Sequence, residues 1–223
     1  MPFVSELIAT FEAIQNPDQA QKMQAYLKDH FTCYGIPTPQ RRATFTALMN
    51  THKSEINLHF RAIAWELFTQ PQRELQHCGI EILQKLLPKN WQKNDLELVE
   101  KFLVMHSWWD SVDTVAKYLL GGYLSRFPEE TFEVIERYSN SDNLWLNRSA
   151  IIFQLGYKAK TNADLLFSEC LKHAHSKEFF IKKAIGWALR EYHRYQPQAV
   201  EQFVASHTLK PLSKKEALKH VAG

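Results

Sequence analysis

Residues 107–120 read SWWDSVDTVAKYLL. Within this stretch Trp109, Val112, Ala116 and Leu120 recur at steps of three or four residues, which is the spacing of one face of an α-helix. Asp113 belongs to the same face, one turn beyond Trp109. A carboxylate on an apolar stripe has either a structural role, in which it is hydrogen-bonded, or a functional role in catalysis or binding. Burial of a carboxylate without a partner would be costly. The pattern alone leaves both interpretations open.

The same helical periodicity extends over almost the whole chain, and no segment alternates as a strand does. It predicts an all-α fold, and short polar links at near-regular spacing indicate stacked helical pairs that form a curved repeat. An ordinary globular helical bundle is the alternative. In the first 70 residues apolar stripes indicate four helices, with Thr38 capping the third. Further helices are expected over residues 72–87, 96–105, 109–120, 129–138, 144–155, 163–174, 177–192, 199–206 and 214–220.

Composition fits one globular domain over residues 1–223, since 45% of the chain is hydrophobic and 23% is charged. We expect a cytoplasmic protein without a membrane span, because no apolar run approaches about 20 residues and the N-terminus lacks a signal-peptide layout. The three cysteines are widely spaced, which is typical of free thiols in a reducing compartment. His173 and His175 lack further ligands nearby, so we expect no metal and no other cofactor.

Charge is distributed unevenly along the chain. Residues 144–223 contain 13 Lys/Arg and 6 Asp/Glu, whereas residues 1–143 contain 14 and 18. This asymmetry favours an anionic partner for the C-terminal half, although a solvated lysine-rich surface would give the same count.

Two later helices carry cations where apolar residues are expected. Arg148 falls within the stripe of the helix at 144–155. It can lie at the edge of the stripe with its guanidinium in water, pair with a carboxylate, or bind a phosphate. In the helix at 177–192, one face carries Lys183, Trp187, Arg190 and Arg194. An aromatic residue flanked by cations is typical of a nucleic-acid surface, while a core tryptophan with surface lysines is the alternative. Gly186 predicts a close approach of another backbone, because glycine costs roughly 1 kcal/mol inside a helix.

Three motifs together carry a resemblance to a known family. They are SWWDSVD at 107–113, WLNR at 145–148 and FIKKAIGWALR at 180–190, accompanied by YGIP at 34–37 and PLSK at 211–214. In this combination and order the chain resembles the AlkD-like DNA glycosylases of the DNA alkylation repair family. The resemblance implies a single domain of HEAT-like helical repeats, curved, with a basic concave face.

The resemblance also implies an activity and a set of site residues. The activity is excision of cationic alkylated purines, N7-alkylguanine and N3-alkyladenine, from double-stranded DNA by a monomer without a deep base pocket. Asp113 is the expected catalytic carboxylate, Trp109 and Trp187 are the expected aromatic walls, and Tyr26 is the candidate N-terminal aromatic contact. The DNA-binding residues expected are Arg148, Lys182, Lys183, Arg190, Arg194, Lys214 and Lys215.

Two further expectations accompany this activity. No lysine stands out as a nucleophile, so we expect a monofunctional glycosylase that leaves an abasic site. The rival hypothesis is a non-catalytic helical-repeat module that binds branched DNA or a protein partner, because a basic repeat surface would serve that role equally well.

Overall fold

A computed structural model describes residues 1–219, and in that range every regular element is a helix, with one isolated bridge between Thr32 and Gln72. The all-α prediction is therefore confirmed. The contacts divide the chain into two compact units, residues 1–90 and 91–223. No helix among the described residues is both long and apolar enough to cross a membrane.

The first unit packs its helices around a core rich in phenylalanine, which includes Phe3, Phe11, Phe45 and Phe68. The pair α4 and α5 makes the most extensive contact in this unit. The elements are α1 (Pro2–Ala13), α2 (Pro17–Tyr26), α3 (Thr38–Thr51), α4 (Lys53–Phe68), α5 (Arg73–Leu86) and the 3₁₀ turn η1 (Leu87–Lys89). The predicted cap at Thr38 is wrong by one residue, because Pro37 is the N-cap and Thr38 is already helical.

A buried carboxylate explains the YGIP turn at residues 34–37. Glu74 accepts hydrogen bonds from the backbone N–H groups of Tyr34, Gly35 and Ile36 at 3.0, 2.9 and 3.2 Å. Gly35 has a φ of +82°, and a Cβ there would lie 2.1 Å from the carbonyl oxygen of Asn16. The turn therefore requires glycine and a buried acceptor, so the motif is structural.

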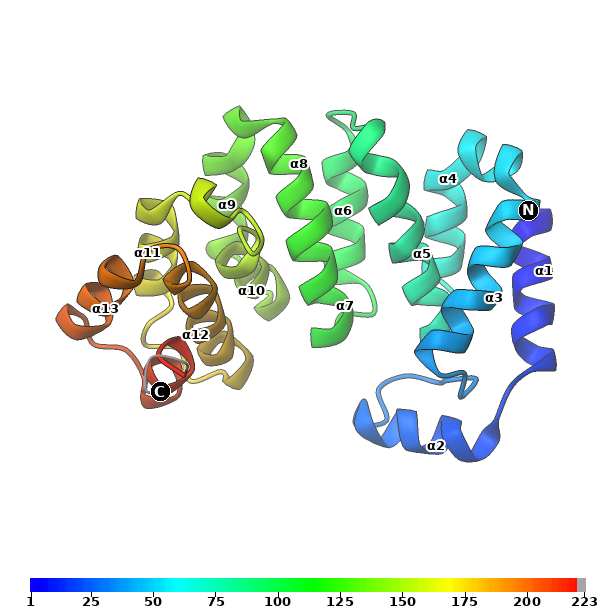
Figure 1. Ribbon diagram of the computed structural model, residues 1–223, viewed down its shortest axis with the longest axis horizontal. Coiled ribbons are helices and arrows are strands. Elements are labelled where there is room, and N and C mark those ends of the chain that lie inside the picture. Colours follow the sequence, from blue (N-terminus) through cyan, green and yellow to red (C-terminus); the bar gives the residue numbers. More distant parts are fainter. Residues whose placement is uncertain (220–223) are drawn as a thin grey trace. The chain divides into compact units, whose positions relative to one another are not determined.

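The second unit holds the remaining helices, which follow the sequence-based ranges closely (Figure 1). They are α6 (Asp95–Val104), α7 (Trp109–Thr114), the π-helical segment η2 (Val115–Leu120), α8 (Gly121–Arg126), η3 (Pro128–Glu130), α9 (Thr131–Ser139), α10 (Leu144–Ile152), η4 (Lys158–Lys160), α11 (Ala163–Lys172), α12 (Phe179–His193), α13 (Pro197–Ser206) and α14 (Pro211–Ala217). Of the helix expected at 214–220, the last residue, His220, lies outside the described residues.

The helix expected at 109–120 is longer than predicted, because α7, η2 and α8 continue into one another, as Figure 1 shows. Gly121 is helical and buried. A Cβ at this position would lie 2.4 Å from the carbonyl oxygen of Phe153. Close packing against the end of α10 therefore explains the glycine. Trp108 is the N-cap of α7, and Ser107 Oγ donates to the Leu103 carbonyl.

The close backbone approach predicted at Gly186 is confirmed. Helix α14 crosses α12 at this residue, so that a Cβ on Gly186 would lie 2.4 Å from Glu216 Cβ and 2.9 Å from the Ser213 carbonyl oxygen. Ser213 Oγ also donates to the Lys182 carbonyl at 3.0 Å. The glycine thus lets α14 pack directly against the helix that carries Trp187.

We expect Gly186→Ala to lower the free energy of unfolding by about 1–3 kcal/mol, because the added methyl group displaces the α14 backbone. Urea denaturation measures this loss. Gly122→Ala is the matched control, since its Cβ meets only the ring edge of Trp91 at 3.1 Å. Alanine's helix propensity offsets part of that contact, so the control is expected to change stability little. Equal losses in both variants would contradict the packing argument.

Candidate active site

An open hollow in the second unit gathers most of the predicted site residues. Its volume is about 310 Å³, near the lower end of the range for small-molecule sites. It lies between α7, α10, α12 and α14. The lining residues are Trp109, Asp113, Arg148, Phe179, Phe180, Lys183, Trp187, Arg190 and Glu216.

Asp113 and Arg148 form a two-pronged ion pair on the wall of this hollow. Arg148 Nε donates to Asp113 Oδ1 at 2.7 Å, and Arg148 Nη2 donates to Asp113 Oδ2 at 2.9 Å. The third prong, Nη1, donates to the carbonyl oxygen of Phe180 in the first turn of α12. The guanidinium therefore joins α7, α10 and α12. Of the three roles left open for Arg148, the structure shows the pair with a carboxylate.

The WLNR motif explains why Arg148 is held so firmly. Asn143 caps α10, and its side-chain oxygen accepts from the N–H groups of Trp145 and Leu146 at 2.8 and 3.3 Å. Asn147 Nδ2 donates to the carbonyls of Tyr138 and Ser141 at the end of α9, at 2.9 and 2.8 Å. The first turns of α10 are thus fixed at both the cap and the neighbouring helix.

An aromatic cluster supports the same corner of the unit. The rings of Trp108 and Trp145 are 5.7 Å apart between centroids, and each contacts Phe180, at 5.4 and 5.0 Å. Trp108 is therefore a packing residue of this cluster and does not line the hollow. Aromatic pairs in such geometry add roughly 0.5–1.5 kcal/mol beyond the area they bury, so the cluster stabilises the packing of α10 against α12.

The Asp113 carboxylate is mostly buried, with 16% of its side chain exposed, and Arg148 is 5% exposed. Burial raises the pKa of Asp113 above its ordinary value, while the Arg148 guanidinium opposes that rise. A carboxylate that accepts two charge-assisted hydrogen bonds from one guanidinium is the ionised form. The geometry therefore presents a fixed negative charge to the hollow.

A second carboxylate, Glu216 on α14, lines the hollow beside the cations of α12. Glu216 Oε1 is 2.9 Å from Lys183 Nζ, and Oε2 accepts from Arg190 Nη1 at 2.8 Å. The hydrogen bonds from Lys183 and Arg190 lower the pKa of Glu216 to about 2. Two cations that the sequence predicted as DNA contacts are therefore engaged with an internal anion.

Trp109 and Trp187 line the same hollow as Asp113, from α7 and α12. Both are partly exposed, which sets them apart from the fully buried core residues. Indole faces attract cations by about 0.5–2 kcal/mol, depending on exposure. The hollow thus combines aromatic faces with a fixed carboxylate, an arrangement suited to a planar, positively charged group.

Comparison with known proteins identifies the family of the chain. Residues 7–221 match a family model described as DNA alkylation repair enzyme. The chain belongs to this family. It is 31% identical to a solved structure described as a predicted DNA alkylation repair enzyme from Enterococcus faecalis, with a TM-score of 0.81 over 93% of this chain and 97% of that one.

Two solved structures of Streptococcus mutans proteins have the same fold as this chain. AlkD2 is 14% identical, with a TM-score of 0.65 over 100% of this chain and 99% of its own. The protein smu.31, from strain UA159, is 14% identical, with a TM-score of 0.59 over 81% and 96%. No protein of curated function matches the chain in sequence.

The other predicted DNA contacts of this family member lie outside the hollow. Arg194 is exposed and pairs with Glu191 at 3.2 Å, while Lys182, Lys214 and Lys215 are partly or fully exposed. Tyr26 ends α2 in the first unit and is 67% exposed. Their contacts with DNA stay predictions.

Phe179, Phe180 and Glu216 line the hollow but were not predicted as site residues. Phe180 stands at the start of the FIKKAIGWALR motif, which was a usable signal. Glu216 follows two lysines, and only the packing at Gly186 brings it to Lys183.

Candidate metal ligands and cysteines were also located among residues 1–219. No group of three or more His, Cys, Asp or Glu side chains there could hold a metal ion. Cys33, Cys78 and Cys170 are free thiols, and burial raises the pKa of Cys78 to about 12. A buried thiol with such a pKa is a poor nucleophile.

Proposed function

We propose that the chain is a monofunctional DNA glycosylase that excises cationic alkylated purines, such as N7-alkylguanine and N3-alkyladenine, from double-stranded DNA. One observation carries the proposal, namely the Asp113 carboxylate held by Arg148 in a hollow that is also lined by Trp109 and Trp187. Membership of the DNA alkylation repair family supports it. The basic C-terminal half supports duplex DNA as the ligand.

The proposed chemistry begins with cleavage of the N-glycosidic bond. Alkylation leaves the purine cationic, so the electron pair of the bond can leave with the base, which becomes neutral. The sugar then carries oxocarbenium character at C1′. The ionised Asp113 stabilises that charge, and water adds to C1′ while its proton passes to the carboxylate.

The walls of the hollow account for the preference for charged lesions. The indole faces of Trp109 and Trp187 attract a cation more strongly than a neutral base. Arg148 has a positioning role in this scheme, because a cation beside a developing cation does not stabilise it. Its hydrogen bonds orient both oxygens of Asp113. The open form of the hollow suits bases that carry bulky alkyl groups.

Release of 7-methylguanine from methylated duplex DNA tests the proposal. We expect the purified protein to release the free base and to leave abasic sites that break only after alkali treatment. Strand breaks without alkali would exclude a monofunctional enzyme. Normal binding to methylated and undamaged DNA without any base release would instead support the rival, a non-catalytic DNA-binding module.

We expect Trp187→Ala to slow excision of 7-methylguanine roughly ten- to thirty-fold, which corresponds to a cation–π interaction of up to about 2 kcal/mol. Affinity for undamaged duplex should fall much less, since that affinity depends on phosphate contacts. Trp187→Phe, which keeps a weaker aromatic face, serves as the graded control. Single-turnover rates and equilibrium binding measure the two effects, and an unchanged rate in Trp187→Ala would remove Trp187 from the site.

A further inference from the structure

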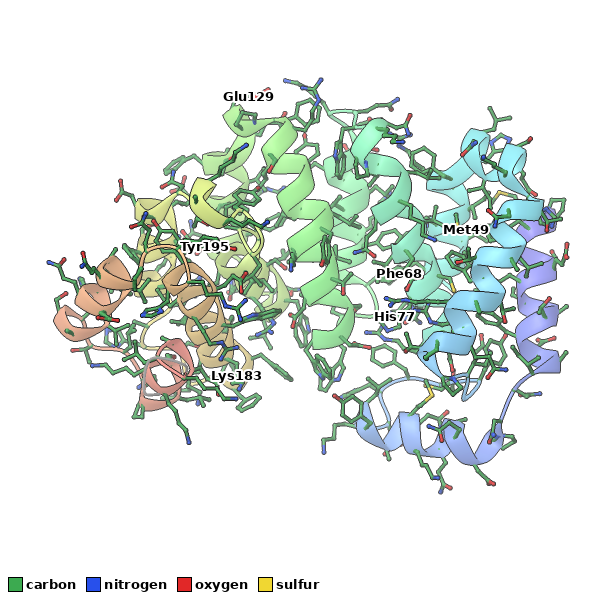
Figure 2. The ribbon with its side chains drawn as sticks, viewed as in Figure 1. Met49, Phe68, His77, Glu129, Lys183 and Tyr195 are labelled. Carbon is green, nitrogen blue, oxygen red and sulfur yellow. The ribbon has the colours of Figure 1, made fainter. Side chains whose placement is uncertain are left out.

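Helix α12 carries one cation on each side of Trp187, and a single carboxylate forms ion pairs with both cations. Lys183 and Arg190 are separated by two turns, and Gly186 lies between them. Because α14 packs on Gly186, the Cβ atom of Glu216 lies beside this glycine. Figure 2 labels Lys183 on α12, beside α14. Its Nζ and the Arg190 guanidinium contact different oxygens of Glu216.

The charges lining the hollow are therefore nearly balanced. The lining residues include three cations, Arg148, Lys183 and Arg190, and two carboxylates, Asp113 and Glu216. Arg148 is committed to Asp113, so Lys183 and Arg190 are the cations that a phosphate could reach. Lys183 is 37% exposed and Arg190 is 20% exposed, while Glu216 is 12% exposed. Both cations are open to solvent, but an anion already contacts each.

We infer that Glu216 is a specificity-determining residue that competes with DNA phosphate for Lys183 and Arg190. It limits the affinity of the hollow for undamaged DNA and keeps a negative charge where a cationic base is to be bound. The inference rests on the proposed function in taking duplex DNA as the ligand. It assigns to the α12–α14 contact a role beyond packing.

The physical basis is competition between like charges for the same donors. A phosphate that approaches Lys183 or Arg190 is repelled by the Glu216 carboxylate. To bind, the phosphate has to displace that carboxylate from one of its hydrogen bonds. With its pKa lowered to about 2, Glu216 stays ionised throughout the neutral range. The competition therefore does not depend on pH between about 5 and 8.

Glu216→Gln tests the inference, because glutamine keeps the shape of the side chain and removes its charge. We expect the variant to bind undamaged duplex DNA more tightly, by roughly tenfold at 0.1 M salt. The slope of log K against log salt should steepen by about 0.9, the value for one additional neutralised phosphate. The full-length protein is titrated with fluorescent duplex at several salt concentrations, at a temperature well below its unfolding transition.

Two further variants make the test specific. Glu201→Gln removes the same charge from α13, where Glu201 is 49% exposed and pairs with His193 outside the hollow, so its slope should equal that of the wild type. In a Lys183→Gln background, Glu216→Gln should gain less affinity, because one of the released cations is missing. This coupling separates local competition from a general charge effect.

The outcomes are distinct. A steeper slope in Glu216→Gln alone, with coupling to Lys183, supports the inference whether or not the wild type releases any base. An unchanged slope, or weaker binding together with lower thermal stability, would show that Glu216 only holds α14 in place and would overturn it. A gain of equal size in Glu201→Gln would overturn it as well. The proposed glycosylase activity is tested separately, by measuring base release by the wild-type protein.

Discussion

Asp113→Asn should reduce the rate of 7-methylguanine excision by about 10²- to 10⁴-fold, the range that general-base and electrostatic groups contribute. Asparagine keeps the size of the side chain and one acceptor for Arg148, so the two helices stay joined. It loses the negative charge that, in the proposed mechanism, stabilises the oxocarbenium character of the sugar. The loss should therefore appear in the single-turnover rate, while affinity for undamaged duplex stays close to that of the wild type.

Asp110→Asn is the matched control for this experiment. Asp110 is the other carboxylate of the segment and lies in the first turn of α7, where it complements the helix dipole. Its substitution should change excision only a few-fold. Retention of most activity in Asp113→Asn, or an equal loss in both variants, would show that Asp113 is not the catalytic carboxylate.

The pattern of apolar residues was sufficient to predict most of the fold. Stripes at helical spacing identify the helices because each one buries a single face, and Gly186 correctly indicated a close backbone approach. The predicted helix boundaries were wrong where a residue that usually ends a helix is instead required by packing against another helix. Gly121 looks like a helix end, yet it permits contact with the Phe153 carbonyl.

The site was predicted in part, because motifs identify residues but not their partners. Trp109, Asp113, Arg148 and Trp187 do line one hollow, as expected. The pair between Arg148 and Asp113 spans 35 residues of sequence. No spacing rule connects positions on different helices, so the sequence alone could not decide whether Arg148 meets water, a carboxylate or a phosphate. Glu216 was missed for the same reason.

Arg148→Met is expected to destabilise the protein by about 3 kcal/mol, because removal of one partner leaves a buried carboxylate without its counter-charge. The Phe180 carbonyl loses its donor as well. Urea denaturation at pH 7 measures the loss. The control is Arg137→Met, which breaks an exposed pair with Glu100 at 2.7 Å, where 50% and 31% of the two side chains are exposed. Exposed pairs contribute at most about 1 kcal/mol.

The pH dependence of Arg148→Met separates charge from packing. Burial already raises the pKa of Asp113, and without the guanidinium it rises further. A carboxyl group whose pKa is higher in the folded than in the unfolded protein favours folding when protonated, so the deficit of the variant should be largest near pH 7 and shrink toward pH 4. In the proposed mechanism excision needs the carboxylate, so the acid limb of the pH–rate profile should move to higher pH in the variant. Adding Asp113→Asn should recover part of the lost stability, because the unpaired charge is then absent. A deficit that is independent of pH and additive with Asp113→Asn would mean that Arg148 stabilises the unit through packing alone.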